Sequence, residues 1–109
     1  MRIDFSEIAE MSLDHFYDGE KQLHTKMIRD EYNKIMKGRL VPGASIGMHT
    51  HETNSEIIFI LEGHGKVLYD DTSEELHAGI AHYCKKGHAH SLINDSDADL
   101  LFYAVVPNQ

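Results

Sequence analysis

The sequence lacks the features that mark membrane-spanning, exported or disulfide-bonded proteins. It has one cysteine, Cys84, so no disulfide can form within the chain and the fold does not depend on an oxidising compartment. No apolar run approaches the roughly 18 to 20 residues that a membrane span needs. The first residues, MRIDFSEIAE, are charged and lack the apolar stretch of a signal peptide. We therefore expect a cytoplasmic protein with no membrane partner.

Basic residues are also few. Ten Lys and Arg stand against 18 Asp and Glu, which gives a formal net charge of −8 at pH 7. The densest basic cluster is the pair Lys85 and Lys86, which is too small to offset repulsion between an acidic chain and phosphate groups. We therefore expect no nucleic-acid partner. Histidine, by contrast, is abundant, with nine residues, and imidazole is the commonest metal-binding side chain.

The chain shows no low-complexity linker and no internal repeat, and its length predicts one domain over residues 1–109, with an N-terminal arm at 1–20. Beyond the arm, short β-compatible segments alternate with turn residues at intervals of roughly eight to twelve positions. These segments are 22–30, 32–41, 45–51, 56–63, 65–70, 73–78, 88–94 and 99–106. Such spacing predicts an all-β fold, either a sandwich or a barrel.

The stretch GASIGMHTHETNSEIIFILEG places three metal-binding side chains before the most apolar segment of the chain. His49 and His51 point together, because residues i and i+2 of a strand share a face. A corner at residues 53–55 would let Glu56 begin the next strand facing the same way. A buried, unpaired carboxylate costs several kcal/mol, and a metal ion shared with two imidazoles removes that cost. The alternative is a solvated strand end with surface histidines, since short metal motifs are weak by themselves.

The strand that begins at Glu56 is apolar on both faces. One face carries Ile58 and Ile60, and the other carries Ile57, Phe59 and Leu61. A strand of this kind is covered on both sides. One face belongs to the barrel interior, and the other needs a second layer or a partner subunit. We therefore predict a homodimer that packs sheet on sheet.

A second group of residues, in GIAHYCKKGHAHSLIN, makes the resemblance to a known family specific. With the stretch at 43–63 it resembles the two motifs of the cupin superfamily, in the form found in compact, single-domain microbial cupins. The first cupin motif reads Gly, five residues, His-x-His, three or four residues, Glu, six residues, Gly. This sequence matches it at Gly43, His49, His51, Glu56 and Gly63.

The second cupin motif, at residues 79–94, reads Gly, five residues, Pro-x-Gly, two residues, His, three residues, Asn. Gly79, Gly87, His90 and Asn94 match it, and Lys85 stands where the family usually has proline. The substitution leaves that turn less rigid but touches no ligand position. The resemblance covers residues 43–94 directly.

The resemblance implies a small jelly-roll barrel, or double-stranded β-helix, of two antiparallel sheets with a site inside its mouth. It also implies that one divalent transition metal per chain is held by His49, His51, Glu56 and His90. Three imidazoles and one carboxylate leave two positions open in six-coordinate geometry. This set favours Mn²⁺ or Fe²⁺, with Ni²⁺, Co²⁺ and Zn²⁺ also allowed. The resulting positive site should attract a small anionic or chelating metabolite.

Fold and ligand set do not fix the function. Cupins with this quartet include oxalate oxidases and decarboxylases, thiol and enediol dioxygenases, isomerases, and proteins that only bind. Our first hypothesis is a small metal-dependent enzyme, an oxidoreductase or decarboxylase, that acts on a carboxylate or another chelating metabolite. The alternatives are a non-catalytic module that binds or senses a small molecule, and a metal-dependent isomerase.

Several other residues keep two interpretations each. His88 either shares the strand face of His90 or lies at the rim of the barrel mouth. The rim is favoured because the turn at Gly87 leaves it ambiguous whether His88 and His90 point to the same side. Asn94 either orients a ligand or holds a turn, and Cys84 is either a redox thiol or a core residue. Lys85, Lys86 and His88 either line the mouth and attract anions or form a solvated turn. His64 lies between two glycines and is assigned to an exposed tight turn. Three tyrosines are assigned to the barrel wall, and three histidines carry no partner pattern: Tyr69, Tyr83, Tyr103, His24, His77 and His82.

Overall fold

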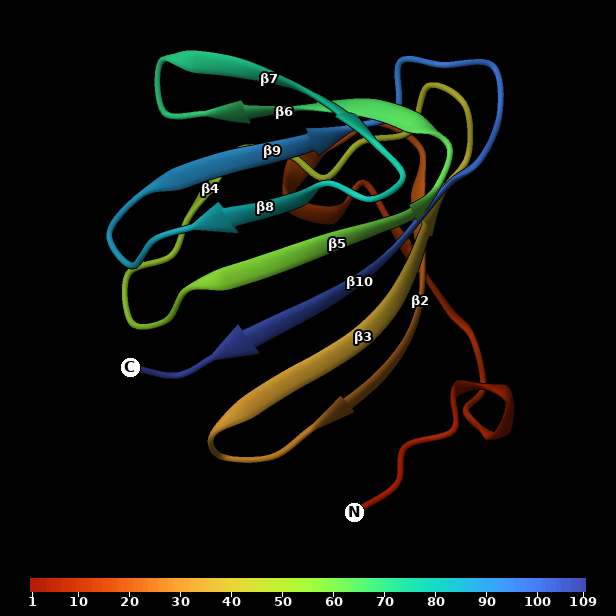
Figure 1. The fold of residues 1–109 in the computed structure, drawn as a ribbon, viewed down its shortest axis with the longest axis vertical. Helices are drawn as coiled ribbons and strands as arrows, with labels where there is room; N and C mark the ends of the chain where they lie inside the picture. The colour runs from red at the N-terminus through yellow and green to blue at the C-terminus, as the bar shows by residue number, and fades with distance from the viewer.

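Two antiparallel sheets make up the fold, and the computed structural model describes all of residues 1–109 (Figure 1). The larger sheet has the strand order β1 (Met11–Asp14), β2 (Gln22–Arg29), β3 (Asn33–Leu40), β10 (Leu100–Pro107), β5 (Glu56–Glu62), β8 (Ala81–Cys84). The smaller sheet has the order β4 (His49–Thr50), β9 (Ala89–Ile93), β6 (His64–Tyr69), β7 (Thr72–His77). Two 3₁₀ turns, η1 (Phe5–Glu7) and η2 (Phe16–Asp18), lie in the N-terminal arm. The predicted all-β jelly roll of two antiparallel sheets is confirmed.

Strand alternation decides which side chains enter the space between the sheets. In β10, Leu100, Phe102, Ala104 and Val106 are buried, while Tyr103 between them is 37% exposed. β5 alternates in the same way, with its even-numbered residues 56, 58 and 60 buried. This is the period of two that a pleated strand imposes, and it matches the face assignment made from the sequence.

Phe102 occupies the centre of the core, where it packs against a glycine on the neighbouring strand. Gly38 is its register partner in β3, and a Cβ added to Gly38 would lie 2.3 Å from the ring carbon Cζ. The apolar cluster of 13 buried residues continues between the two sheets. Buried polar residues, among them Ser55, Glu56 and His90, mark a site at the edge of that core.

The N-terminal arm packs on the barrel at three places. β1 pairs with β2, and the ring of Phe5 stacks on that of Tyr103 with centroids 5.4 Å apart. The turn after β1 lies against Gly47, whose N–H donates a 3.0 Å hydrogen bond to the carbonyl of Phe16. A Cβ at Gly47 would lie 1.7 Å from the carbonyl oxygen of Tyr17, so only glycine permits this approach.

Neither of the two short helical turns is long and apolar enough to cross a membrane.

Candidate metal centre

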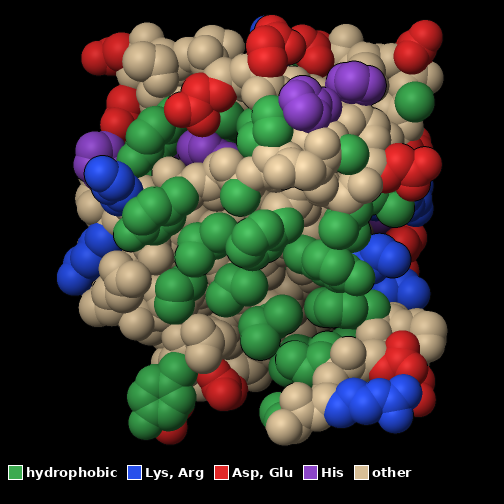
Figure 2. Space-filling model, in the orientation of Figure 1, with side chains coloured by type: hydrophobic (Ala, Val, Ile, Leu, Met, Phe, Trp, Pro, Cys, Tyr) green, Lys and Arg blue, Asp and Glu red, His purple; other side chains and the backbone are tan.

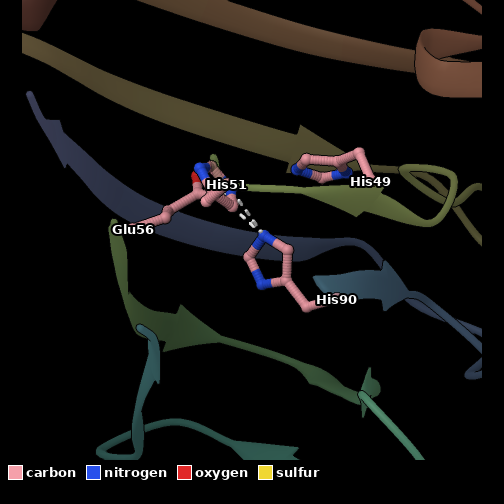
Figure 3. A group of neighbouring side chains, drawn as sticks. All are labelled: His49, His51, Glu56 and His90. Carbon is pink, nitrogen blue, oxygen red and sulfur yellow. Dashed lines mark hydrogen bonds and ion pairs between the residues drawn. The ribbon is translucent and has the colours of Figure 1, made fainter. Parts of the chain in front are cut away.

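Four side chains from three strands and one corner converge at the mouth of the barrel (Figure 3). His49 lies on β4 and is the direct cross-strand partner of His90 on β9. His51 follows β4, and Glu56 is the first residue of β5. Each residue offers one ligand atom, and these four atoms all lie within 4.8 Å of one another. The structure therefore brings together the four residues that the two sequence motifs single out.

The corner between His51 and Glu56 is held by the end of the chain. The N–H of Ser55 donates to the carbonyl of Pro107 at 3.3 Å, and the N–H of Gln109 donates to Thr53 at 2.9 Å. This pairing starts β5 with the Glu56 side chain directed inward, where the residue is only 7% exposed. On a straight strand Glu56 would face away from His51, because the two positions are an odd number of residues apart. The corner turns the Glu56 side chain to the same side as His51.

The spacing of the inner donor atoms fits adjacent ligands of a single ion. His51 Nε2 lies 3.0 Å from His90 Nε2 and 3.3 Å from Glu56 Oε1, and His90 Nε2 lies 2.9 Å from that same oxygen. Two ligands at right angles, each about 2.1 Å from a metal, would be about 3 Å apart. The ring of His49 lies edge-on to both other imidazoles, with centroid distances of 4.8 and 4.9 Å. The donor set fits a divalent metal.

Hydrogen bonds on the outer side of the cluster fix the tautomer and ring orientation of two of these imidazoles. His49 Nδ1 lies 2.7 Å from the carbonyl oxygen of Gly47, and His51 Nδ1 lies 2.5 Å from the amide oxygen of Asn54. Because these oxygens only accept hydrogen bonds, each Nδ1 carries the proton and donates it. Each Nε2 is then left with a free lone pair directed toward the cluster, which is the arrangement metal-binding histidines adopt.

The charge of the site follows from burial and from these contacts. Burial opposes ionisation of Glu56, but its contacts with His51 and His90 outweigh it and hold the pKa of the carboxyl well below its ordinary value. Burial lowers the pKa of His49 to about 4, so this imidazole is neutral at pH 7. Burial also opposes protonation of His51, yet its contacts with Glu56 and Asn54 leave its pKa raised overall. A carboxylate therefore faces imidazoles at neutral pH.

Two residues near the cluster were not predicted. The ring of Tyr17 stacks on His49 at 4.1 Å and 8°, from a turn in which His15, Tyr17, Asp18 and Lys21 all have positive φ. The pair Asp18 and Gly19 predicts a turn, but no sequence signal shows that this turn packs on residues 45–47 beside His49.

His82 is the second unpredicted residue, 3% exposed and directly behind His90. Burial, followed by the positive charge of His90 when protonated, lowers the pKa of His82. A sequence signal for it did exist. His82 and Cys84 share a strand face, so assigning Cys84 to the core also implies an inward-facing His82.

Burial and contacts place three further candidates, His88, Cys84 and Asn94. His88 lies at the surface, 45% exposed, with Nδ1 2.5 Å from Asp70 Oδ2, which supports the rim interpretation. Cys84 is fully buried, and burial raises the pKa of its thiol to about 12, which supports the core interpretation. Asn94 is fully buried, and its amide donates to the carbonyls of Leu40 and Ala98, both at 2.8 Å. It therefore holds a turn.

Comparison with known sequences settles the family. A sequence profile of the cupin domain matches residues 36–106. The chain belongs to the cupin family. This cupin is 39% identical over 69 residues to the oxalate-binding protein of Thermotoga maritima, an alignment that covers 62% of this chain and 56% of the relative. The match thus spans little more than half the length of that protein.

Solved structures share the fold. A Thermotoga maritima crystal structure described as a predicted oxalate decarboxylase superposes with a TM-score of 0.93 and 26% identity over 100% of both chains. The cupin domain of Cnp3 from Schizosaccharomyces pombe gives a TM-score of 0.82 at 14% identity, covering 100% of this cupin and 74% of that chain. The second likeness shows the fold alone. In a cupin barrel, the three histidines and Glu56 fit a divalent-metal site.

Proposed function

We propose that this cupin holds one divalent transition metal through His49, His51, Glu56 and His90, and that the metal binds a small chelating carboxylate such as oxalate. The observation that carries the proposal is the convergence of four ligand atoms within 4.8 Å around a buried carboxylate. Mn²⁺ or Fe²⁺ suits this mixed nitrogen and oxygen set, and Ni²⁺, Co²⁺ and Zn²⁺ are alternatives.

The cluster needs a cation for electrostatic reasons. His51 donates its Nδ1 proton outward to Asn54, so in its neutral form its Nε2 lone pair faces Glu56 Oε1 at 3.3 Å. Acceptor atoms that face each other at this distance, away from water, repel unless a positive charge lies between them. In the metal-free protein a proton on an imidazole has that role, consistent with the raised pKa of His51. A divalent ion would satisfy all the acceptors at once.

The charge of the filled site favours an anionic ligand. Three neutral imidazoles and one carboxylate contribute −1, so a divalent ion leaves the site at +1 inside an acidic protein. Such an ion supplies Lewis-acid polarisation of a bound carboxylate. The identity to an oxalate-binding protein supports oxalate as the first ligand to test.

A metal-dependent enzyme, an oxidoreductase or a decarboxylase, is the second candidate. The full-length similarity to a protein described as a predicted oxalate decarboxylase favours it. Binding and turnover are separated by one assay on metal-loaded protein. Oxygen uptake and CO₂ release are followed with oxalate and then with a panel of carboxylates and enediols. Ligand binding without either signal identifies a binding protein.

The metal site itself is tested by elemental analysis of protein purified without added metal and by thermal unfolding with added Mn²⁺, Fe²⁺, Ni²⁺ or Zn²⁺. At metal concentrations about 100 times the Kd, binding should stabilise the fold by about 2.7 kcal/mol. Glu56→Gln keeps the shape but removes the charge, so the thermal shift should shrink strongly. Glu52→Gln, on an exposed residue of the same corner, is the matched control. Absence of bound metal together with unchanged melting temperatures would show that the proposal is wrong.

We also infer a homodimer that covers the outer face of the larger sheet. Phe59, Leu61, Tyr83 and Tyr103 lie on adjacent strands of that sheet and are 46%, 38%, 50% and 37% exposed. Figure 2 shows hydrophobic side chains gathered over β3, β5 and β10. Contiguous apolar patches of this kind mark interaction surfaces. Light scattering at micromolar concentration should give the dimer mass for wild type and the monomer mass for Phe59→Glu.

Tyr32→Glu is the control for the dimer experiment, because Tyr32 is 66% exposed but lies in the β2–β3 turn. This variant should remain dimeric. A monomeric wild type would rule out the dimer without touching the metal site.

A further inference from the structure

A chain of hydrogen bonds leads from His90 away from the cluster to the protein surface. His90 Nδ1 lies 3.1 Å from His82 Nε2, and His82 Nδ1 lies 3.0 Å from Glu74 Oε1. His82 comes from β8 and Glu74 from β7, so the chain joins the two sheets at the open edge of the barrel. The side chain of His82 is 2% exposed, whereas that of Glu74 is 46% exposed.

The order of protons along this chain follows from its outer end. An ionised carboxylate only accepts hydrogen bonds, so the proton between Glu74 and His82 lies on His82 Nδ1. Neutral His82 then has an unprotonated Nε2, which accepts a hydrogen bond from His90 Nδ1. His90 in turn keeps its Nε2 lone pair for the cluster, where that atom lies 2.9 Å from Glu56 Oε1. Glu74 therefore dictates the tautomer of a residue it does not touch.

We infer that His82 and Glu74 form a positioning pair, which holds His90 in its metal-binding tautomer and orientation and makes metal affinity depend on a surface carboxylate. This inference rests on the proposed metal site. It completes a pattern, because His49 is fixed by the Gly47 carbonyl and His51 by the Asn54 amide. Without the pair, His90 would be the one histidine of the cluster with no outer acceptor. A carboxylate behind a ligating histidine also raises its basicity as a ligand.

Packing alone does not account for this arrangement. His82 lies opposite Ile58 in the β5–β8 register and is 3% exposed, so an apolar side chain at this position would avoid burying polar atoms. Instead, both of its ring nitrogens are used. The ring of Tyr69 also lies edge-on to His82 at 5.2 Å and restricts its rotation.

The test compares two neighbouring glutamates of β7. Glu74 and Glu75 are both exposed, and removing either charge changes the net charge equally, but only Glu74 contacts His82. Titration with Mn²⁺ should give a Kd about 10-fold weaker for Glu74→Gln, because the glutamine amide can still accept from His82 but has lost the carboxylate charge; this is the lower end of the usual range for changing an outer partner of a metal ligand. Glu75→Gln should match wild type. His82→Leu should weaken binding about 100-fold, and His82→Gln, whose amide oxygen still accepts from His90, should recover most of the loss.

A readout that a purely structural role would leave unchanged is the ring ¹⁵N spectrum of the Zn²⁺-loaded protein. Wild type should show His90 protonated at Nδ1 only, and that signal should shift in Glu74→Gln but not in Glu75→Gln. Melting temperatures of the metal-free variants show whether Glu74→Gln is folded. If wild type binds Mn²⁺ and Glu74→Gln and His82→Leu bind it equally tightly with unchanged spectra, the positioning pair is refuted and the metal site stands. If wild type binds no metal, both proposals fail.

Discussion

Asn94 offers a decisive test of a residue whose role the sequence left open between ligand orientation and turn support. Its amide nitrogen donates to the carbonyls of Leu40 and Ala98, and its amide oxygen accepts from the N–H and hydroxyl of Ser96. The residue is 0% exposed. We predict that Asn94→Ala destabilises the fold and leaves metal affinity unchanged.

The magnitude follows from the acceptors left behind. Each buried carbonyl that loses its partner costs roughly 1–3 kcal/mol, while Ser96 lies near the surface and can bond to water. With one of the two carbonyls only partly buried, the expected loss is about 3 kcal/mol. That is a large part of the roughly 5–15 kcal/mol that stabilises a typical domain. It should lower the melting temperature by roughly 10–20 °C in a chain of this size.

The assay is urea unfolding of metal-free protein, paired with Mn²⁺ titration at a temperature where the variant is folded. Ser96→Ala is the control, since it removes the half-buried hydroxyl partner and should cost less than about 1 kcal/mol. The turn role is refuted if Asn94→Ala loses metal affinity while its free energy of unfolding stays within about 1 kcal/mol of wild type. That result would assign Asn94 to orienting a ligand.

Three further predictions follow from other parts of the molecule. In metal-free protein the pKa of His49 is about 4 against an ordinary 6.5, so the unfolded chain takes up the proton first. The contribution of neutral His49 to the free energy of unfolding is therefore fully present above pH 6.5 and is lost as the pH drops toward 4. In urea titrations, His49→Gln should reduce this loss of unfolding free energy by about 1.5 kcal/mol, a value that allows for the partial exposure of His49. Gly38→Ala should cost about 1–3 kcal/mol by overpacking, and adding Phe102→Leu should recover part of it if the ring contact is the cause. Replacing Lys85 and Lys86 by alanine should weaken oxalate binding at low salt only, and an unchanged affinity there would assign them to a solvated turn.

Sequence reasoning reached the site through local strand patterns and through the resemblance to the two cupin motifs. The shared face of His49 and His51, and the restart at Glu56 after a polar corner, follow from strand geometry alone. The second motif supplied His90, and strand alternation divided β5 into an inner and an outer face, as the structure shows. The strand faces need no knowledge of long-range contacts, whereas the resemblance to the cupin family was needed to assign His90.

What sequence reasoning missed depends on contacts between distant segments. β8 is only four residues long, between turn residues, and its pairing with β5 gives it its strand geometry. Tyr17 reaches His49 only because its turn packs on Gly47, where no side chain fits. The outer partners of the histidines are likewise set by the fold, since Glu74 meets His82 across two sheets.

The burial of Cys84 gives the protein an internal reporter. The thiol lies in β8 directly opposite Glu56 and is fully buried, and burial raises its pKa to about 12. A thiol-specific reagent can therefore react only when β8 detaches from the edge of the sheet, and no other cysteine competes for it. The labelling rate of the natural chain measures how often this edge of the barrel opens beside the carboxylate, without any introduced probe.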